Sequence, residues 1–343
     1  MSGAFLSSRE AAAVIYGLSG TVLSAAECKF FRATDPLGFI LFQRNCDTPE
    51  QVRRLVLDLR DAVGRGDAPV LIDQEGGRVA RLKPPHWPAY PAAAKITALG
   101  GMRGWEAAFL AARLIADDLG QLGITIDCAP VLDLPVTGAN EVIGDRAWSK
   151  DPEIAGTLGL AVCDGLMAGG VLPIIKHIPG HGRAMVDSHL ALPEVDTPRD
   201  VLDANDFIPF RMLAGMPWAM TAHVLYKALD SALPATLSPT VIAETIRASI
   251  GFDGVLLSDD LSMQALGGRL DERATGALKA GCDLVLHCNG DMNEMQAIAG
   301  VVGPMNAAAA RRVAVGEARR FAPGAFDRYA AEQRFAALLQ DAR

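Results

Sequence analysis

Short apolar runs recur along the chain, and segments long enough for a helix separate them. Within each run the apolar residues are continuous and do not alternate with polar ones. This pattern is typical of parallel strands that are buried on both faces. It predicts eight strands, at residues 14–18, 38–42, 69–73, 124–127, 172–176, 218–222, 254–258 and 283–287.

The segments between the runs carry signals for helix starts. Ser24 and Glu27 have the spacing of a capping box, and Thr48 precedes a proline at the expected first helical position. The Ala-rich sequence after about residue 293 predicts amphipathic helices, most clearly at 307–312. Eight strand–helix units predict a (β/α)8 TIM-type barrel, whose functional groups lie at the carboxyl ends of the strands.

The chain is predicted to form a single domain over residues 1–343, with the barrel at about 12–290 and C-terminal helical additions at about 291–343. Its length of 343 residues suits one large α/β barrel, and a hydrophobic content of 50% is enough for a sizeable core. A doubly wound open sheet is the alternative. It is less favoured because the chain has neither a GxGxxG nor a GxxxxGK[ST] loop.

Composition narrows the classes of partner. A formal net charge of −8 argues against binding to nucleic acid. The six cysteines show no CxxC spacing, so we expect reduced thiols. Residues 1–20 lack the basic and apolar regions of a signal peptide, and no apolar stretch reaches the roughly 18 residues that span a bilayer. We therefore expect a cytoplasmic protein without nucleic-acid or membrane partners. The sequence is silent on oligomeric state, and a monomer is the expectation.

Polar residues that can carry chemistry lie at the carboxyl ends of several predicted strands: Asp73, Lys176, His177, His223, Asp259 and His287. After Lys176 and His177 comes a Pro-Gly turn and a loop with Asp187 and His189. A histidine is a natural general acid/base near neutral pH, and a carboxylate two positions away can orient its ring and raise its basicity. This loop predicts a proton shuttle at the mouth of the barrel.

Asp259 and Asp73 are the carboxylates that this reasoning singles out. In a retaining glycosidase, a carboxylate attacks the anomeric carbon and forms a glycosyl-enzyme, and Asp259 can take that part. Asp260 or Ser262 could instead cap a following helix, and the Asp259–Asp260 pair offers too few ligands for a convincing cation site. Asp73 begins a Gly-containing loop, where a carboxylate could accept hydrogen bonds from two hydroxyls of a sugar.

A metal site is the alternative reading of the histidines. His177 and His181 have the i, i+4 spacing of zinc ligands on a helix, and His189 could complete a set of three. Pro179 and Gly180 lie between the first two, however, and no Glu follows His177, so the HExxH pattern fails. We expect no metal and no cofactor, and a metal-dependent hydrolase stays as the less favoured alternative.

The motifs IIKHIPGHG with DSH, SDDLSM and DQEGGRVAR together resemble the β-N-acetylglucosaminidases of glycoside hydrolase family 3, the single-domain enzymes of bacterial cell-wall recycling. GFILFQRN, APVLDLP, VIGDRAW and DFIPFRML resemble the same family, and the motifs follow in order from about residue 14 to about residue 290. One segment departs from it, because the family's DVEG-like first-strand sequence reads GLSG at 17–20. We assign no sugar contact there.

The resemblance implies a retaining exo-β-N-acetylglucosaminidase that removes N-acetylglucosamine from muropeptides carrying anhydro-N-acetylmuramic acid. By the same resemblance, Asp259 is the nucleophile, His189 is the general acid/base and Asp187 is its partner. It also implies that the sugar is contacted by Asp73, Arg81, Arg146, Lys176 and His177. A histidine acid/base leaves no second carboxylate to repel an anionic acceptor, so phosphorolysis is an alternative reaction.

Overall fold

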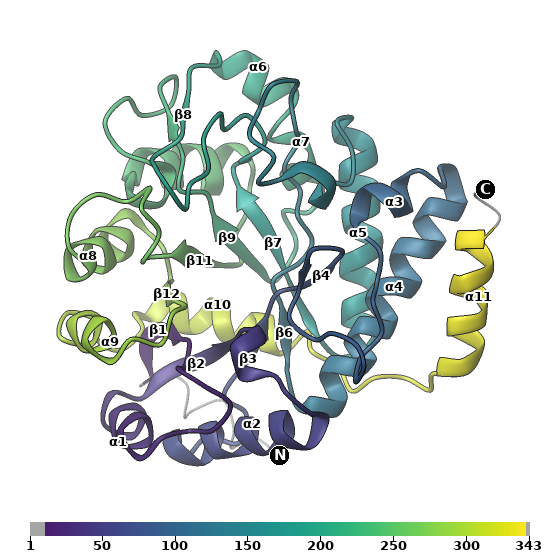
Figure 1. The fold of residues 1–343 in the computed structure, drawn as a ribbon. Helices are drawn as coiled ribbons and strands as arrows, with labels where there is room; N and C mark the ends of the chain where they lie inside the picture. The colour runs from purple at the N-terminus through teal and green to yellow at the C-terminus, as the bar shows by residue number, and fades with distance from the viewer. Residues whose placement is uncertain (1–10, 341–343) are drawn as a thin grey trace.

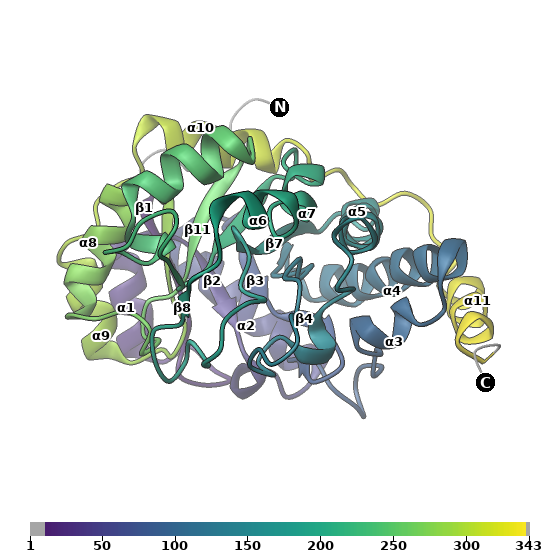
Figure 2. The same cartoon turned by 90° about the horizontal axis from the view of Figure 1, so that it is seen from above.

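The structure, a computed structural model, describes residues 11–340. Eight parallel strands close into a barrel in the order β1-β12-β11-β9-β7-β6-β3-β2, with helices around the outside (Figures 1 and 2). The barrel strands are β1 (Ala12–Tyr16), β2 (Pro36–Leu41), β3 (Val70–Ile72), β6 (Ile126–Asp127), β7 (Leu172–Ile178), β9 (Trp218–Thr221), β11 (Val255–Asp260) and β12 (Leu284–His287).

The barrel closes where the first strand pairs with the last. Val14 of β1 lies opposite Val285 of β12, and Ile15 lies opposite Gly38 of β2 on the other side. All eight predicted strands are confirmed, each overlapping the observed strand. The TIM-type barrel is therefore the fold, and the alternative open sheet is wrong.

Eleven α-helices are found within residues 11–340: α1 (Ala25–Thr34), α2 (Pro49–Val63), α3 (Ala93–Thr97), α4 (Gly101–Leu122), α5 (Pro152–Ala168), α6 (Arg199–Ala204), α7 (Ile208–Met212), α8 (Leu270–Ala280), α9 (Met292–Ala299), α10 (Ala307–Glu317) and α11 (Arg328–Gln340). Three short 3-10 helices and one π-helix accompany them: η2 (Gln43–Asn45), η3 (Gly144–Arg146), η4 (Ala235–Leu237) and η5 (Val241–Ser249). None of the helices in this part of the chain is long and apolar enough to cross a membrane.

Both predicted helix starts are confirmed. Ser24 accepts a hydrogen bond from the backbone N–H of Glu27, whose side chain accepts one from the backbone N–H of Ser24. Thr48 caps α2 and Pro49 is its first residue. These contacts satisfy backbone groups that a helix end would otherwise leave unpaired.

The C-terminal helices cover the outside of the barrel. An extended connection leads from α10 to α11, and α11 packs on α4 at the edge of the molecule (Figure 1). Arg328 of α11 lies 2.8 Å from Asp117 and 2.7 Å from Asp118 of α4. The helix predicted at 307–312 is confirmed as part of α10. The first ten and last three residues of the predicted domain lie outside the described residues.

Two short two-stranded sheets accompany the barrel, an antiparallel hairpin of β4 (Gln74–Gly76) and β5 (Val79–Ala80) and a parallel pair of β8 (Glu194–Val195) and β10 (Leu225–Tyr226). The barrel strands themselves are almost wholly buried. Each large apolar side chain contributes about 1.5–3 kcal/mol when fully buried. That rigid core lets the strand ends hold polar side chains in fixed positions.

Candidate active site

One cavity of about 350 Å³ opens beyond the carboxyl ends of the barrel strands. Its walls contain all eight residues that the sequence analysis assigned to a site: Asp73, Arg81, Arg146, Lys176, His177, Asp187, His189 and Asp259. They come from β7, β11 and the segments after β3, β6 and β7, so barrel closure brings together residues that are far apart in the sequence.

A network of paired charges forms one wall of the cavity. Lys176 Nζ lies 2.9 Å from Asp73 Oδ1 and 2.6 Å from Glu75 Oε1. Arg81 binds the other oxygen of Asp73 at 2.9 Å, and Arg146 donates two hydrogen bonds of 2.8 Å to Glu75. Glu75 was not singled out from the sequence, although it lies two residues after Asp73 in the recognised DQEGG segment.

These ion pairs fix the protonation states of the wall. Burial raises the pKa of a carboxyl group, but here Lys176 and the arginines outweigh it. They hold the pKa of Asp73 well below its usual range and lower the pKa of Glu75 to about 2. Burial also works against the charge of Lys176, yet the two carboxylates raise its pKa. The wall therefore presents ionised groups that can orient hydroxyls.

Two glycines shape the hairpin that returns Arg81 to Asp73. Gly76 and Gly77 link β4 to the turn before β5 and have φ angles of +95° and +58°. Side chains rarely adopt this left-handed region, and a Cβ at Gly76 would lie 2.6 Å from the carbonyl oxygen of Pro91. The tight Gly-containing loop expected from the sequence is thus confirmed.

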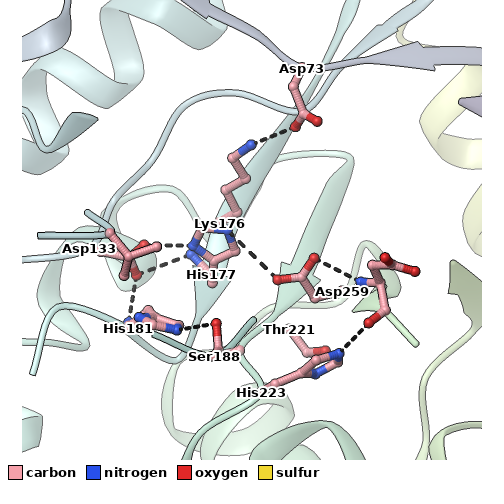
Figure 3. A network of polar contacts seen from close by, with 12 residues as sticks. Asp73, Asp133, Lys176, His177, His181, Ser188, Thr221, His223 and Asp259 are labelled. Atoms are coloured by element: carbon pink, nitrogen blue, oxygen red, sulfur yellow. Dashed lines mark hydrogen bonds and ion pairs between the residues drawn. The ribbon is translucent and has the colours of Figure 1, made fainter. Parts of the chain in front are cut away.

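His177 is held by Asp133, a carboxylate that the sequence analysis did not single out (Figure 3). Nδ1 of His177 lies 2.7 Å from Asp133 Oδ2. Asp133 Oδ1 accepts the backbone N–H groups of His177 at 3.1 Å and of His181 at 2.6 Å. Because Nδ1 is taken by Asp133, Nε2 is the nitrogen that can meet a ligand or Asp259.

Asp259 extends from β11 toward His177, and the labelled side chains of Figure 3 show the two facing each other. Its Oδ1 accepts the backbone N–H of Asp260 at 2.8 Å, while Oδ2 lies 4.0 Å from His177 Nε2. Burial raises its pKa, but His177 and the backbone N–H of Asp260 help to outweigh burial and lower the pKa of Asp259 below the usual value. An ionised carboxylate with one oxygen free of backbone contacts can act as a nucleophile.

Asp260 does not cap a helix, contrary to the alternative considered above. Strand β11 continues through Asp260, and the next helix, α8, begins only at Leu270. The Asp260 side chain instead accepts the backbone N–H of Ser262 at 3.2 Å and of Cys288 at 3.1 Å. It ties the end of β11 to the segment after β12.

Asp187 and His189 form a pair on the loop after β7. Asp187 Oδ1 lies 2.8 Å from His189 Nδ1 and accepts the backbone N–H of the same residue at 2.9 Å. Burial opposes this charge, but the contacts with His189 lower the pKa of Asp187. The His189 side chain is 64% exposed. Its ring is therefore oriented by a carboxylate and accessible to a molecule in the cavity.

The histidines form separate hydrogen-bonded pairs rather than a three-ligand set. His177 pairs with Asp133 and His189 with Asp187, while Nε2 of His181 lies 3.0 Å from Ser188 Oγ. Burial lowers the pKa of His181 to about 4, so its ring is neutral at pH 7. Within residues 11–340, no three His, Cys, Asp or Glu side chains are grouped to hold a metal ion.

Comparisons with known proteins show the family of the chain. Residues 31–315 match the glycosyl hydrolase family 3 N-terminal domain. Over 290 residues the chain is 41% identical to the beta-hexosaminidase of Alkalilimnicola ehrlichii, covering 80% of each protein. It is 39% identical over 268 residues to the beta-hexosaminidase of Neisseria gonorrhoeae FA 1090, covering 75% of this chain and 73% of the relative.

Solved structures of family 3 enzymes are also similar to this chain. NagZ from Neisseria gonorrhoeae in complex with N-trifluoroacetyl-D-glucosamine superimposes with a TM-score of 0.85 at 32% identity, over 96% of this chain and 98% of NagZ. A family 3 beta-N-acetylglucosaminidase from Paenibacillus sp. FPU-7 gives a TM-score of 0.79 at 32% identity, over 100% of this chain and 63% of that enzyme. The barrel fold, the family match and the relatives named beta-hexosaminidase together define a glycoside hydrolase. The chain belongs to glycosyl hydrolase family 3.

Proposed function

We propose that this protein is a retaining exo-β-N-acetylglucosaminidase, a β-hexosaminidase that needs no cofactor or metal. The observation that carries the proposal is the shared cavity of the ionised Asp259 and the Asp187–His189 pair. A carboxylate and a proton carrier around one saccharide-sized space are the groups that a double displacement requires.

The proposed reaction uses both groups twice. His189 protonates the oxygen of the leaving group while Asp259 Oδ2 attacks the anomeric carbon, which forms a covalent glycosyl ester. His189, now neutral, takes a proton from water, and the resulting hydroxide breaks the ester and releases the sugar. Two inversions give overall retention. Asp187 keeps the His189 ring oriented and stabilises the charge that the imidazolium carries before the first step and regains in the second.

We assign recognition of the sugar to the charged wall. Asp73 and Lys176 would bind hydroxyls opposite Asp259, and Arg81, Arg146 and His177 would complete the contacts. Charge-assisted hydrogen bonds of this kind give orientation as well as affinity. The N-acyl glucosamine in the Neisseria gonorrhoeae NagZ structure supports the choice of N-acetylglucosamine.

The proposed substrate is a muropeptide with N-acetylglucosamine β-1,4-linked to anhydro-N-acetylmuramic acid. Similarity to proteins named beta-hexosaminidase and NagZ supports the release of an N-acetylhexosamine. A role in peptidoglycan recycling in the cytoplasm is part of the same proposal and follows from the resemblance of the motifs. We propose that the chain acts as a monomer, with residues 1–343 as a single catalytic domain.

The test compares an aryl β-N-acetylglucosaminide with the matching β-glucoside. We expect hydrolysis of the first at least about 100-fold faster in kcat/KM, because only the first carries the 2-acetamido group of the proposed substrate, and a site built to bind a polar group rejects an analogue that lacks it. A slow fluorinated N-acetylglucosaminide should then label Asp259, as read by mass spectrometry of the peptide. No hydrolysis of the aryl N-acetylglucosaminide would reject the proposal, and a label on another residue would reject the assignment of Asp259.

Phosphorolysis is a second candidate reaction. It is favoured by the imidazole of His189 as the proton carrier in the cavity wall, since a neutral imidazole does not repel an incoming anion as a carboxylate would. Incubation with inorganic phosphate should then give sugar 1-phosphate. Release of free sugar alone would eliminate this reaction and leave hydrolysis.

A further inference from the structure

A buried histidine lies behind the nucleophile and has no part in the proposed chemistry. His223 follows β9 and has no exposed surface. Its Nε2 lies 3.0 Å from the carbonyl oxygen of Asp260, and its Nδ1 lies 2.7 Å from Thr236 Oγ1. Figure 3 shows the ring beside the end of β11 that carries Asp259.

The direction of these hydrogen bonds follows from the atoms involved. A carbonyl oxygen only accepts, so Nε2 of His223 carries the proton that it donates to Asp260. In a neutral ring Nδ1 is then an acceptor, and Thr236 must donate to it. The hydroxyl of Thr221, 2.7 Å from Thr236, supplies the donor for Thr236 in turn. The result is a relay with one polarity: Thr221 to Thr236, to His223, to the Asp260 carbonyl.

A protonated His223 would reverse part of this relay. Nδ1 would then donate to Thr236, and the single hydroxyl proton of Thr236 would turn to the carbonyl oxygen of Ala222, 3.1 Å away. Burial acts against that state and lowers the pKa of His223, although Asp259 and Asp260 pull in the opposite direction. The neutral ring with its proton on Nε2 is therefore the form present at neutral pH.

The relay ends on the residue that holds the nucleophile. The backbone N–H of Asp260 donates to Asp259 Oδ1 at 2.8 Å, and the Asp260 side chain accepts the N–H of Cys288 at 3.1 Å. His223 donates a hydrogen bond to the carbonyl oxygen of the same residue. With Asp260 fixed through its carbonyl, its side chain and its N–H, one carboxylate oxygen of Asp259 is restrained and the other is left for the cavity.

We propose that His223 is a positioning residue for Asp259. As the neutral Nε2–H tautomer, it holds the backbone of Asp260 in place so that the carboxylate of Asp259 points at the anomeric carbon. This inference rests on the proposed function, because it assumes that Asp259 attacks a sugar. It predicts a loss in the rate of attack with little change in binding of the sugar, since His223 does not line the cavity.

The kinetic test uses H223A, H223Q and a control, H86A, which removes an exposed histidine outside the cavity. A misplacement of about 1 Å can cost about 100-fold in rate, so we expect kcat of H223A on an aryl β-N-acetylglucosaminide to fall about 100-fold. The inhibition constant of free N-acetylglucosamine should stay within about threefold. The side-chain amide of H223Q can still donate to Asp260 and should recover activity to within about tenfold of wild type.

The outcomes separate the two proposals. A wild-type enzyme without hydrolysis would contradict the proposed function. An active wild type with kcat of H223A within about threefold, or with equal losses in rate and in sugar binding, would overturn the positioning role alone. So would an H223Q variant no better than H223A.

A second measurement does not depend on enzyme activity. Nitrogen-15 shifts of the histidine rings in the whole protein report tautomers directly, and H223Q assigns the signal. We expect a neutral ring protonated on Nε2 at pH 7. A ring protonated on Nδ1, or an imidazolium at that pH, would overturn the relay even if the enzyme hydrolyses its substrate as proposed.

Discussion

Asp133 holds the ring of His177 in one orientation, with Oδ2 2.7 Å from Nδ1. The carboxylate lies at the back of the site and is fully buried, yet it keeps its charge. Burial raises its pKa, but His177 and the N–H of His181 outweigh burial and lower the pKa of Asp133 to about 2. The consequence is a fixed tautomer for His177, with Nδ1 donating and Nε2 turned toward Asp259.

Asp133→Asn should therefore misorient His177. The amide NH2 would oppose the Nδ1–H that now points at the carboxylate, so the ring must change tautomer or turn. A lost charge-assisted hydrogen bond is worth about 2–3 kcal/mol, so we expect kcat/KM to fall about 30- to 100-fold. Asp291→Asn, a change at the exposed cap of α9, should leave kcat/KM unchanged. Full activity in Asp133→Asn would show that the Asp133–His177 pair does not contribute to catalysis.

Asp259→Ala tests the nucleophile itself. We expect less than about a thousandth of wild-type turnover, as for loss of a covalent nucleophile. The methyl group also leaves space beside the anomeric carbon, so added azide should restore part of the rate with an activated aryl glycoside. The product should be the α-linked glycosyl azide, formed by one inversion. Near-normal turnover without azide would show that another group attacks.

His189→Ala tests the proton carrier. A leaving group that is a stable anion needs no proton, whereas an alkoxide of a second sugar does. We expect kcat/KM to fall more than about 100-fold for disaccharide substrates and far less for a dinitrophenyl glycoside. Steady-state rates on both substrates provide the comparison. Equal losses on the two would disqualify His189 as the general acid.

Most of the barrel could be predicted from local sequence. Most of the contacts that hold the side chains of the site in place could not. Continuous apolar runs mark strands directly, and strand ends such as Lys176 and Asp259 mark the cavity. Asp133 and His177 are 44 positions apart, so only closure of the barrel brings them together. Glu75 lies inside a recognised motif, but its partners Lys176 and Arg146 are on distant segments that only the folded barrel brings beside it.

Lys176→Met should destabilise the fold as well as the site. It would leave Asp73 and Glu75 buried with only Arg81 and Arg146 for compensation. Breaking a buried ion pair by removing one partner costs about 3–5 kcal/mol of unfolding free energy. Lys227→Met, which removes an exposed pair with Glu194, is the matched control and should leave urea unfolding unchanged. A similar midpoint for both variants would show that the buried network contributes little.

Asp127 provides a test of pH dependence. Its Oδ1 accepts the backbone N–H of Gln74 at 2.9 Å, but its buried Oδ2 has no hydrogen-bond partner within the described residues. Burial raises the pKa of Asp127 to about 7. A folded-state pKa above the unfolded value means that the stability contributed by this group is complete below about pH 4 and is lost as the pH rises through 7. Ionised Asp127 therefore destabilises the fold in alkaline solution.

Asp127→Asn removes that ionisation and keeps an oxygen for Gln74. The unfolding free energy of the variant minus that of wild type should be about 2–3 kcal/mol larger at pH 8 than at pH 5, which means that the variant gains stability relative to wild type as the pH rises. Urea unfolding of both proteins at the two pH values measures this difference directly, and all other titrating groups cancel between them. Asp291→Asn serves again as the control, because its carboxylate is exposed at a helix cap. If the relative stability of Asp127→Asn were the same at both pH values, Asp127 would already be ionised at pH 5.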